Sequence, residues 1–226
     1  MILLIDDANI DLIENAYDYY PISGVTTNPT ILSKIGGNPF DILREIRDFI
    51  YDDQLHVQAV SRKAEDIVEE AKHIVDILGE DTYVKIPAIP EGFKAMNILN
   101  ETTEILFTAT AIYTPMQAYI ASESGAAYVA PYVNRIDNMG FNGLDVTRQI
   151  QDILNNNEME TEILAASFKN SQQVLELCEY GISAVTVTPD LLMNLTKNPE
   201  INSAVENFIS DFESFAGRGK TMLDFD

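Results

Sequence analysis

The chain has 226 residues, of which 46% are hydrophobic and 22% are charged, so it can bury the core of one domain of moderate size. Its 36 acidic residues outnumber 14 basic residues, and the formal net charge is −22. A surface of this charge repels the phosphates of nucleic acids and anionic lipid headgroups, so we expect neither as a partner. It also repels phosphorylated small molecules, and any phosphate site therefore needs a local group of basic side chains.

The sequence also indicates a cellular compartment. The single cysteine, Cys178, excludes an intrachain disulfide bond and favours a reducing environment. The first residues, MILLIDD, contain two acids and no basic residue, which argues against a secretion signal. No apolar run approaches the roughly 18 residues that a membrane helix needs. We therefore expect a soluble cytoplasmic protein that forms a single domain over residues 1–226.

Eight short apolar runs, rich in β-branched residues, predict eight strands. They lie at 1–6, 24–28, 55–60, 83–88, 104–110, 128–133, 162–167 and 184–189. Segments with apolar residues at helical spacing, such as 64–78, separate them. The alternation predicts parallel strands in an α/β fold, and eight such units favour a closed (β/α)8 TIM barrel. An open doubly wound sheet is the alternative, although no G-x-G-x-x-G motif follows the first strand.

The C-terminal segment, 199–226, exceeds what a minimal barrel needs. Residues 199–215 predict an additional helix with a broad apolar stripe, and the tail AGRGKTMLDFD follows it. The helix could pack on its own barrel or cover a neighbouring subunit. The residues alone leave both possibilities open.

Lys85 lies in the fourth predicted strand, YVKIPA, on the face opposite to Val84 and Ile86. In a barrel this face points inward, where a charged ammonium group is costly to bury. Desolvation lowers the pKa of a lysine, and the neutral amine is a nucleophile toward carbonyl groups. Lys85 is therefore a candidate Schiff-base lysine. The alternative is a structural lysine that pairs with an inward carboxylate.

Most of the other predicted strands carry a polar residue late in the run and on one face. The carboxyl ends of the strands meet at the mouth of a barrel, where barrel enzymes place their chemistry. Single residues have structural explanations, since Asp6 and Ser167 could cap helices and Tyr132 could be a core tyrosine. Together they indicate a polar pocket around one lysine. The residues are Asp6, Thr26, Asn28, Gln58, Thr108, Thr110, Tyr132, Ser167 and Thr186.

Basic residues follow two of these strands. Arg135 lies just after the sixth predicted strand and Lys169 just after the seventh. With Ser167 they could form the basic group that a phosphate site requires, because arginine binds phosphate with two parallel hydrogen bonds. For Arg135 alone, a surface ion pair with Asp137 is the alternative.

The sequence contains few of the residues that usually bind transition-metal ions. His56 and His73 are its only histidines, and with one cysteine they cannot form an imidazole or thiolate metal cluster. Cys178 lies at a core-like position of a helical stretch. The neighbouring acids Asp6 and Asp7 are too common a pair to indicate a magnesium site. We expect no metal ion and no cofactor.

Five motifs occur in the order and at the spacing of a known family. They are GVTTNPTIL (24–32), YVKIPA (83–88), TAIY (110–113), YVAPYVNRID (128–137) and ILAASFKN (163–170). Over essentially its whole length the chain resembles the fructose-6-phosphate aldolase and small transaldolase family. The resemblance implies a (β/α)8 barrel and class I aldolase chemistry without a metal. It also implies a homo-oligomer, a decamer in known members, in which the C-terminal helix contacts an adjacent subunit.

The resemblance implies a role for each matching residue. Lys85 matches the Schiff-base lysine, Asp6 an aspartate near the substrate hydroxyl groups, and Thr110 a threonine that helps to hold the catalytic water. The motif T-T-N-P matches residues that bind the dihydroxyacetone unit; here these are Thr26 and Asn28. The residues that match phosphate contacts are Arg135, Ser167 and Lys169.

Two positions discriminate between the activities of the family. Gln58 stands where the aldolases have glutamine and transaldolases have glutamate, and Tyr132 stands where transaldolases usually have phenylalanine. A phenol beside the catalytic water gives a proton route to the enamine, which must be protonated before dihydroxyacetone can leave. We therefore expect an aldolase that cleaves or forms fructose 6-phosphate from dihydroxyacetone and glyceraldehyde 3-phosphate. The alternatives are a transaldolase of the pentose phosphate pathway and a non-catalytic barrel that binds sugar phosphates.

Overall fold

The computed structural model describes residues 1–225. The chain divides into two units: Met1–Leu192, and a second unit that begins at Met193.

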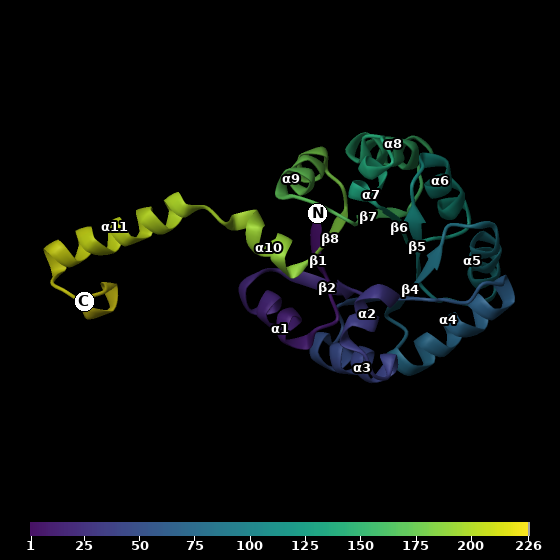
Figure 1. Ribbon diagram of the computed structural model, residues 1–226, viewed down its shortest axis with the longest axis horizontal. Coiled ribbons are helices and arrows are strands. Elements are labelled where there is room, and N and C mark those ends of the chain that lie inside the picture. The colour runs from purple at the N-terminus through teal and green to yellow at the C-terminus, as the bar shows by residue number, and fades with distance from the viewer. Residues whose placement is uncertain (226) are drawn as a thin grey trace. The chain divides into compact units, whose positions relative to one another are not determined.

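The first unit is a closed barrel of eight parallel strands in sequence order (Figure 1). The strands are β1 (Ile2–Asp6), β2 (Ile22–Thr26), β3 (Gln54–Gln58), β4 (Thr82–Pro87), β5 (Phe107–Ile112), β6 (Tyr128–Pro131), β7 (Glu162–Ala165) and β8 (Ala184–Val187). Strand β1 pairs with β2 on one side and with β8 on the other, which closes the ring. The prediction of a (β/α)8 barrel is confirmed, and the open sheet is wrong because an open sheet has two edge strands.

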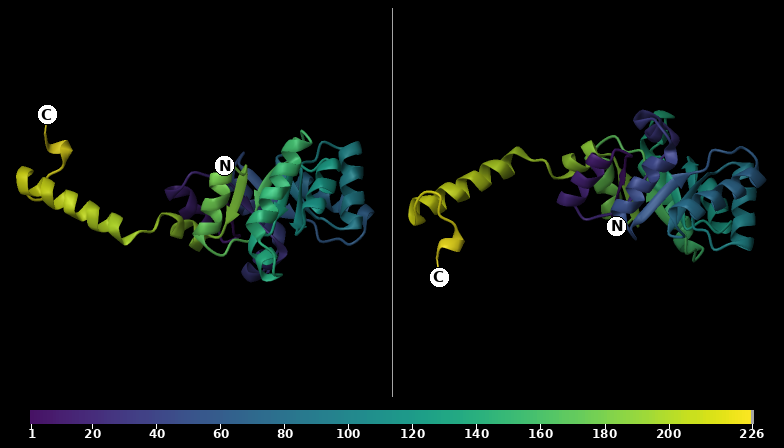
Figure 2. Two further views of the ribbon diagram at one scale, coloured as in Figure 1. Left: turned by 90° about the horizontal axis from the view of Figure 1, so that it is seen from above. Right: turned by 90° about the horizontal axis from the view of Figure 1, so that it is seen from below.

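Helices connect the strands and surround them, as the views in Figures 1 and 2 show. They are α1 (Ile10–Tyr19), α2 (Pro29–Ile35), α3 (Pro39–Ile50), α4 (Ala64–Leu78), α5 (Pro90–Thr102), α6 (Pro115–Glu123), α7 (Val133–Asn138), α8 (Gly143–Asn156) and α9 (Ser171–Tyr180). Helix α10 (Pro189–Thr196) follows the last strand and extends past the end of the first unit. Helix α4 buries the apolar positions that the spacing over 64–78 predicts. Burying these positions stabilises the barrel, since each large aliphatic side chain contributes about 1.5–3 kcal/mol.

Some strand boundaries differ from the predicted ones. Strand β2 begins before Gly24 and ends at Thr26, so Asn28 lies in the loop beyond it. Strand β6 ends at Pro131, and the apolar Val133 already belongs to α7. An apolar run continues through the end of a strand when the following helix also faces the core, and composition alone cannot separate the two.

Gly24 sets the position of β2 against β3. It has φ +157°, and a Cβ atom there would collide with the main-chain oxygen of Gln54. Only glycine therefore allows the two strands to approach this closely. The resulting register pairs Thr26 with His56, near the carboxyl end of the barrel.

The second unit contains α11 (Pro199–Ala216) and the short 3-10 helix η1 (Met222–Asp224). Asn198 begins α11 by accepting a hydrogen bond from the main-chain nitrogen of Glu200. The additional C-terminal helix is thus confirmed. Its apolar stripe is exposed, with Phe208 at 71% and Phe215 at 79%. Among the described helices, none is long and apolar enough to cross a membrane.

Candidate active site

A small cavity of about 120 Å³ lies at the carboxyl end of the barrel. It brings together polar residues that end different strands, as expected for the mouth of a (β/α)8 barrel. Most of the site residues expected from the sequence line it. The lining consists of Asp6, Thr26, Asn28, Lys85, Ala130, Tyr132, Arg135, Leu164, Ala166, Ser167 and Thr186.

Lys85 is the amine of this cavity. It lies on β4 and is buried, with 6% of its surface exposed. Its Nζ donates a hydrogen bond to the main-chain oxygen of Thr27 at 2.7 Å. Burial lowers the pKa of Lys85, Asp6 opposes this shift, and the positive charge of Arg135 adds to it. A larger neutral fraction makes the amine a better nucleophile toward a ketone.

Asp6 is the carboxyl group of the same cavity. Its Oδ1 accepts a hydrogen bond from the Thr26 hydroxyl group at 2.7 Å. Burial raises the pKa of Asp6, although the charge of Lys85 and the bond from Thr26 both act in the opposite direction. Burial thus moves the acid and the amine toward their neutral forms. An acid and an amine whose pKa values are shifted toward each other can exchange protons with a substrate at lower cost.

The structure does not use Asp6 as a helix cap. Asp7 accepts hydrogen bonds from the main-chain nitrogens of Ala8 and Asn9, each at 2.8 Å, and the side chain of Asn9 caps α1. The capping explanation of Asp6 is therefore wrong. Its carboxyl group belongs to the cavity instead.

Tyr132 and Thr110 form a second polar pair. The Tyr132 hydroxyl group lies 2.6 Å from the Thr110 Oγ1 and is hydrogen-bonded to it. The guanidinium carbon of Arg135 lies 4.6 Å from the centre of the Tyr132 ring, and the edge of the Tyr113 ring packs on the same residue. These contacts hold the phenol at the cavity wall. Tyr132 has a satisfied hydroxyl group, as a core tyrosine would, but it is only half-buried and lines the cavity.

Arg135 and Ser167 bring a guanidinium group and a hydroxyl group to the cavity lining. The alternative partner of Arg135, Asp137, instead accepts hydrogen bonds from Gly143 and Gln173, both at 2.7 Å. Ser167 has φ +61°, a strained value for a residue with a side chain. Such strain is found at functional sites, where the surrounding structure holds it in place.

The proposed cap by Ser167 is wrong. The side chain of Asn170 caps α9, because it accepts a hydrogen bond from the main-chain nitrogen of Gln173 at 3.0 Å. The main-chain oxygen of Ser167 accepts one from Asn134 at 2.7 Å. This bond ties the loop after β7 to the start of α7 and leaves the serine side chain at the cavity.

Three expected residues lie outside the lining of this cavity. Thr110 is one of them, and it is connected to the cavity through its hydrogen bond to Tyr132. Gln58 pairs in register with Lys85 on the neighbouring strand, but it lines a separate cavity of about 430 Å³ formed mainly by α2, α3 and α4. Lys169 is exposed, and its main-chain nitrogen donates to Gln173 at 2.7 Å. The structure therefore does not join Gln58 to the Tyr132–Thr110 pair.

Two contributors to the site were not assigned a role from the sequence. The carbonyl oxygen of Thr27 holds the amine of Lys85, and no side-chain pattern signals a main-chain contact. Thr186 lies 2.7 Å from Thr26 between their hydroxyl oxygens. Its inward position on β8 was visible in the alternation, but its partner was not.

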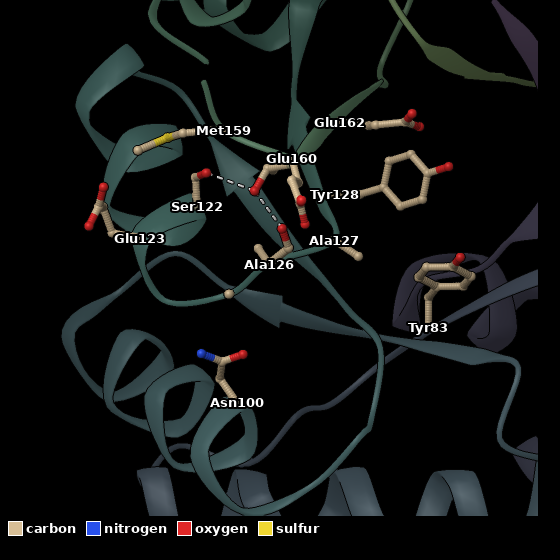
Figure 3. Close-up of a pocket in the computed structure, with 12 residues that line it drawn as sticks. Tyr83, Asn100, Ser122, Glu123, Ala126, Ala127, Tyr128, Met159, Glu160 and Glu162 are labelled. Carbon is tan, nitrogen blue, oxygen red and sulfur yellow. Dashed lines mark hydrogen bonds between the residues drawn. The ribbon is translucent and has the colours of Figure 1, made fainter. Parts of the chain in front are cut away.

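A larger cavity, of about 590 Å³, lies at the opposite end of the barrel, where the strands begin (Figure 3). Tyr83, Tyr128 and Glu162 come from the first residues of three strands and line one side of it. Glu123 and Glu160 line the other side, so the cavity repels phosphate groups. It lacks the amine that carbonyl chemistry needs. Among the described residues, no group of three or more histidine, cysteine or acidic side chains is arranged to hold a metal ion.

Comparisons with known proteins identify the family. Residues 3–223 match the family described as Transaldolase/Fructose-6-phosphate aldolase. The chain is 38% identical to a "Probable transaldolase" of a Hydrogenobaculum species, over 94% of this chain and 97% of that protein. It is 37% identical to a protein of the same description from Thermoplasma acidophilum, over 99% of this chain and 100% of that protein.

Solved structures of lower identity share the fold. A mandelate oxidase matches with a TM-score of 0.55 at 13% identity, covering 91% of this chain and 69% of that one. At this identity the likeness concerns the fold alone. The family match and the full-length relatives go further: the chain is an enzyme that belongs to the transaldolase/fructose-6-phosphate aldolase family.

Proposed function

We propose that this enzyme is a class I aldolase that cleaves or forms fructose 6-phosphate, with Lys85 as the Schiff-base nucleophile. One observation carries the proposal. The amine of Lys85 is buried at the carboxyl end of the barrel, its pKa is lowered by burial, and it shares a cavity with a carboxyl group, a phenol and a guanidinium group. Carbonyl chemistry through an amine needs a neutral amine with acid–base groups beside it.

The cycle begins at the amine. Neutral Lys85 attacks C2 of the ketose, and loss of water from the adduct forms an iminium ion. The C3–C4 bond then breaks, its electron pair moves toward the iminium nitrogen, and the C4 hydroxyl group loses its proton. Glyceraldehyde 3-phosphate leaves and an enamine remains. Protonation of the enamine at C3 and hydrolysis release dihydroxyacetone and regenerate Lys85.

Tyr132, Thr110 and Asp6 serve the proton transfers in this proposal. The 2.6 Å bond between Tyr132 and Thr110 orients the phenol, which then delivers and removes protons through a water molecule. Asp6 orients the hydroxyl groups of the substrate from β1. Gln58, which pairs in register with Lys85, completes the water site in this proposal, although the cavity lining does not include it.

Arg135 and Ser167 anchor the phosphate group in this proposal, with Lys169 as a third contact, and Thr26 and Asn28 bind the dihydroxyacetone part. The positive charges of Arg135 and Lys169 offset the repulsion that a chain of net charge −22 exerts on sugar phosphates. Binding energy from the phosphate positions the scissile bond at the amine.

Transfer of the dihydroxyacetone unit to a second aldehyde is the other candidate, since the relatives are described as probable transaldolases. Tyr132 and Gln58 favour cleavage. Product analysis with and without erythrose 4-phosphate separates the two reactions. A transaldolase would release little free dihydroxyacetone and would require the acceptor.

Borohydride reduction in the presence of dihydroxyacetone, followed by intact mass measurement, tests the Schiff base itself. The parent chain should gain one reduced dihydroxyacetone unit, and the Lys85→Met variant should gain none. A parent chain without an adduct would refute the Schiff base and favour a barrel that only binds sugar phosphates.

We also propose that the chain works in the cytoplasm as a homo-oligomer, on the scale of a decamer, and that residues 199–226 contact a neighbouring subunit. The exposed phenylalanines Phe208 and Phe215 of α11 support this, because isolated chains rarely expose such a stripe. Light scattering on the full-length chain should show a large particle. The pair of changes Phe208→Ser and Phe215→Ser should reduce its mass, and an unchanged mass would exclude this contact.

A further inference from the structure

Three polar side chains from three strands form a continuous line along the cavity wall. The Thr186 and Thr26 hydroxyl oxygens lie 2.7 Å apart, and the Thr26 hydroxyl group donates to the Asp6 Oδ1 at 2.7 Å. Thr26 is fully buried and Thr186 is 4% exposed. Residues 160 positions apart in the chain thus meet in a short hydrogen-bonded line.

The chemistry of the groups gives this line a direction. An ionised carboxylate can only accept hydrogen bonds, and a hydroxyl group has a single proton to donate. When Asp6 is ionised, the Thr26 hydroxyl group donates its only proton to Asp6, so the Thr26 oxygen must accept a hydrogen bond from Thr186. The line then runs from Thr186 through Thr26 to Asp6. When Asp6 is protonated, the whole line can reverse.

The strand register places Thr186 behind this contact. Thr186 pairs with Leu4 on β1, whereas Thr26 pairs with Asp6, two residues closer to the mouth of the barrel. Thr186 therefore supports Thr26 from the interior. A hydroxyl group that is both held and polarised by a neighbour is a stronger donor to its own acceptor.

The orientation of the Thr26 hydroxyl group affects the charge state of Asp6. Asp6 is half-buried and faces the charged groups of Lys85, Arg135 and Asp7, and its desolvation works against its own charged form. The bond from Thr26 is one of the interactions that favour the carboxylate. A freely rotating Thr26 hydroxyl group would make this bond for only part of the time, and the carboxylate would be less favoured.

We propose that Thr186 is a positioning residue, which orients the Thr26 hydroxyl group toward Asp6 and thereby keeps Asp6 as an acceptor for a hydroxyl group of the substrate. The inference rests on the proposed function only for the identity of the substrate. The hydrogen-bonded line and its effect on Asp6 belong to the free protein.

The first test compares Thr186→Val, which removes the hydroxyl group at nearly constant volume, with Thr186→Ser, which keeps it. We expect the valine variant to lower kcat for fructose 6-phosphate cleavage about tenfold at neutral pH, as a slightly misplaced reacting group does. The acid limb of its pH profile should move to higher pH. The serine variant should restore both properties. Thr147→Val is the matched control, because Thr147 is a fully buried threonine of α8 whose hydroxyl group bonds a main-chain oxygen; this control should leave both properties unchanged.

A double-mutant cycle separates positioning from a general loss of stability. If Thr186 acts through Asp6, Thr186→Val should cost nothing further once Asp6→Asn is in place. Independent losses that multiply would overturn the proposal, and so would a valine variant with the kcat and acid limb of the parent.

The titration of Asp6 tests the line without any turnover. Isotope-edited infrared spectra of the free enzyme, with Asp6→Asn as the reference, follow the protonated carboxyl group of Asp6. Thr186→Val should move this titration to higher pH, and Thr186→Ser should not. An unmoved titration would overturn the proposal even if the enzyme cleaves fructose 6-phosphate. A moved titration would support it even if borohydride trapping shows no adduct on Lys85.

Discussion

Replacing Lys85 with methionine should abolish turnover and at the same time make the protein more stable. The substitution keeps an unbranched side chain of similar length inside the barrel and removes the amine. Lys85 is 6% exposed, and burial lowers its pKa, so the folded state holds its charged form at a cost. Functional sites often carry such a cost, and removing the functional group then stabilises the fold.

The magnitude follows from the contacts of the amine. The change loses one hydrogen bond to the Thr27 oxygen, which contributes about 1 kcal/mol. It removes the penalty for burying an ammonium group, which amounts to several kcal/mol for an ion in a protein interior. Asp6 loses the attraction of the Lys85 ammonium group, but burial already favours the neutral form of Asp6. We expect a net gain of about 1–2 kcal/mol, which corresponds to roughly 2–8 °C in Tm for a chain of this size.

The pH dependence of the stability gain tests its sign a second time. A lysine with a lowered pKa in the folded state binds fewer protons there than in the unfolded chain. Its penalty is therefore complete below the folded pKa and disappears as the pH rises through the unfolded value. The stability gain of Lys85→Met should accordingly be larger at neutral pH than at strongly alkaline pH.

Thermal unfolding at equal subunit concentration measures the gain, since assembly shifts apparent stability. Lys72→Met is the control, because Lys72 is an exposed residue of α4, and its effect should stay within about 0.5 kcal/mol. A Lys85→Met variant with a lower Tm than the parent would refute the reasoning. The amine would then be a stabilising structural group.

Three further outcomes follow from the site. Tyr132→Phe should lower the rate of cleavage by about 10²-fold or more. Tyr132→Phe combined with Gln58→Glu should raise the ratio of transfer to cleavage when erythrose 4-phosphate is present. An unchanged ratio would show that neither residue decides between the two reactions. Arg135→Ala should raise KM for fructose 6-phosphate by roughly 10- to 100-fold but leave KM for unphosphorylated fructose nearly unchanged, which steady-state kinetics with both substrates would test. Dialysis against EDTA should leave the cleavage rate unchanged, because Lys85 supplies the electron sink; a loss that added metal restores would contradict this mechanism.

The barrel could be predicted because its signals are local. A strand repeats every two residues and a helix every 3.6, so eight apolar runs and the intervening helical spacings predict parallel strands and their order. The same alternation predicted that Lys85 faces inward, and the structure places it there. The residues that cap the helices were harder to predict. Asp6 and Ser167 each precede a helix by a few residues, but Asn9 and Asn170 lie closer and cap α1 and α9.

Local patterns in the chain thus predicted the order of the strands, the inward lysine and the polar residues at the carboxyl ends of their strands. The tertiary structure alone decided which of these side chains touch. It joined Thr186 to Thr26 across 160 positions and gave Lys85 a main-chain acceptor. The reason is physical: alternation along a strand is set by the backbone of that strand, whereas contacts across a barrel depend on register and twist, which arise only when all eight strands close.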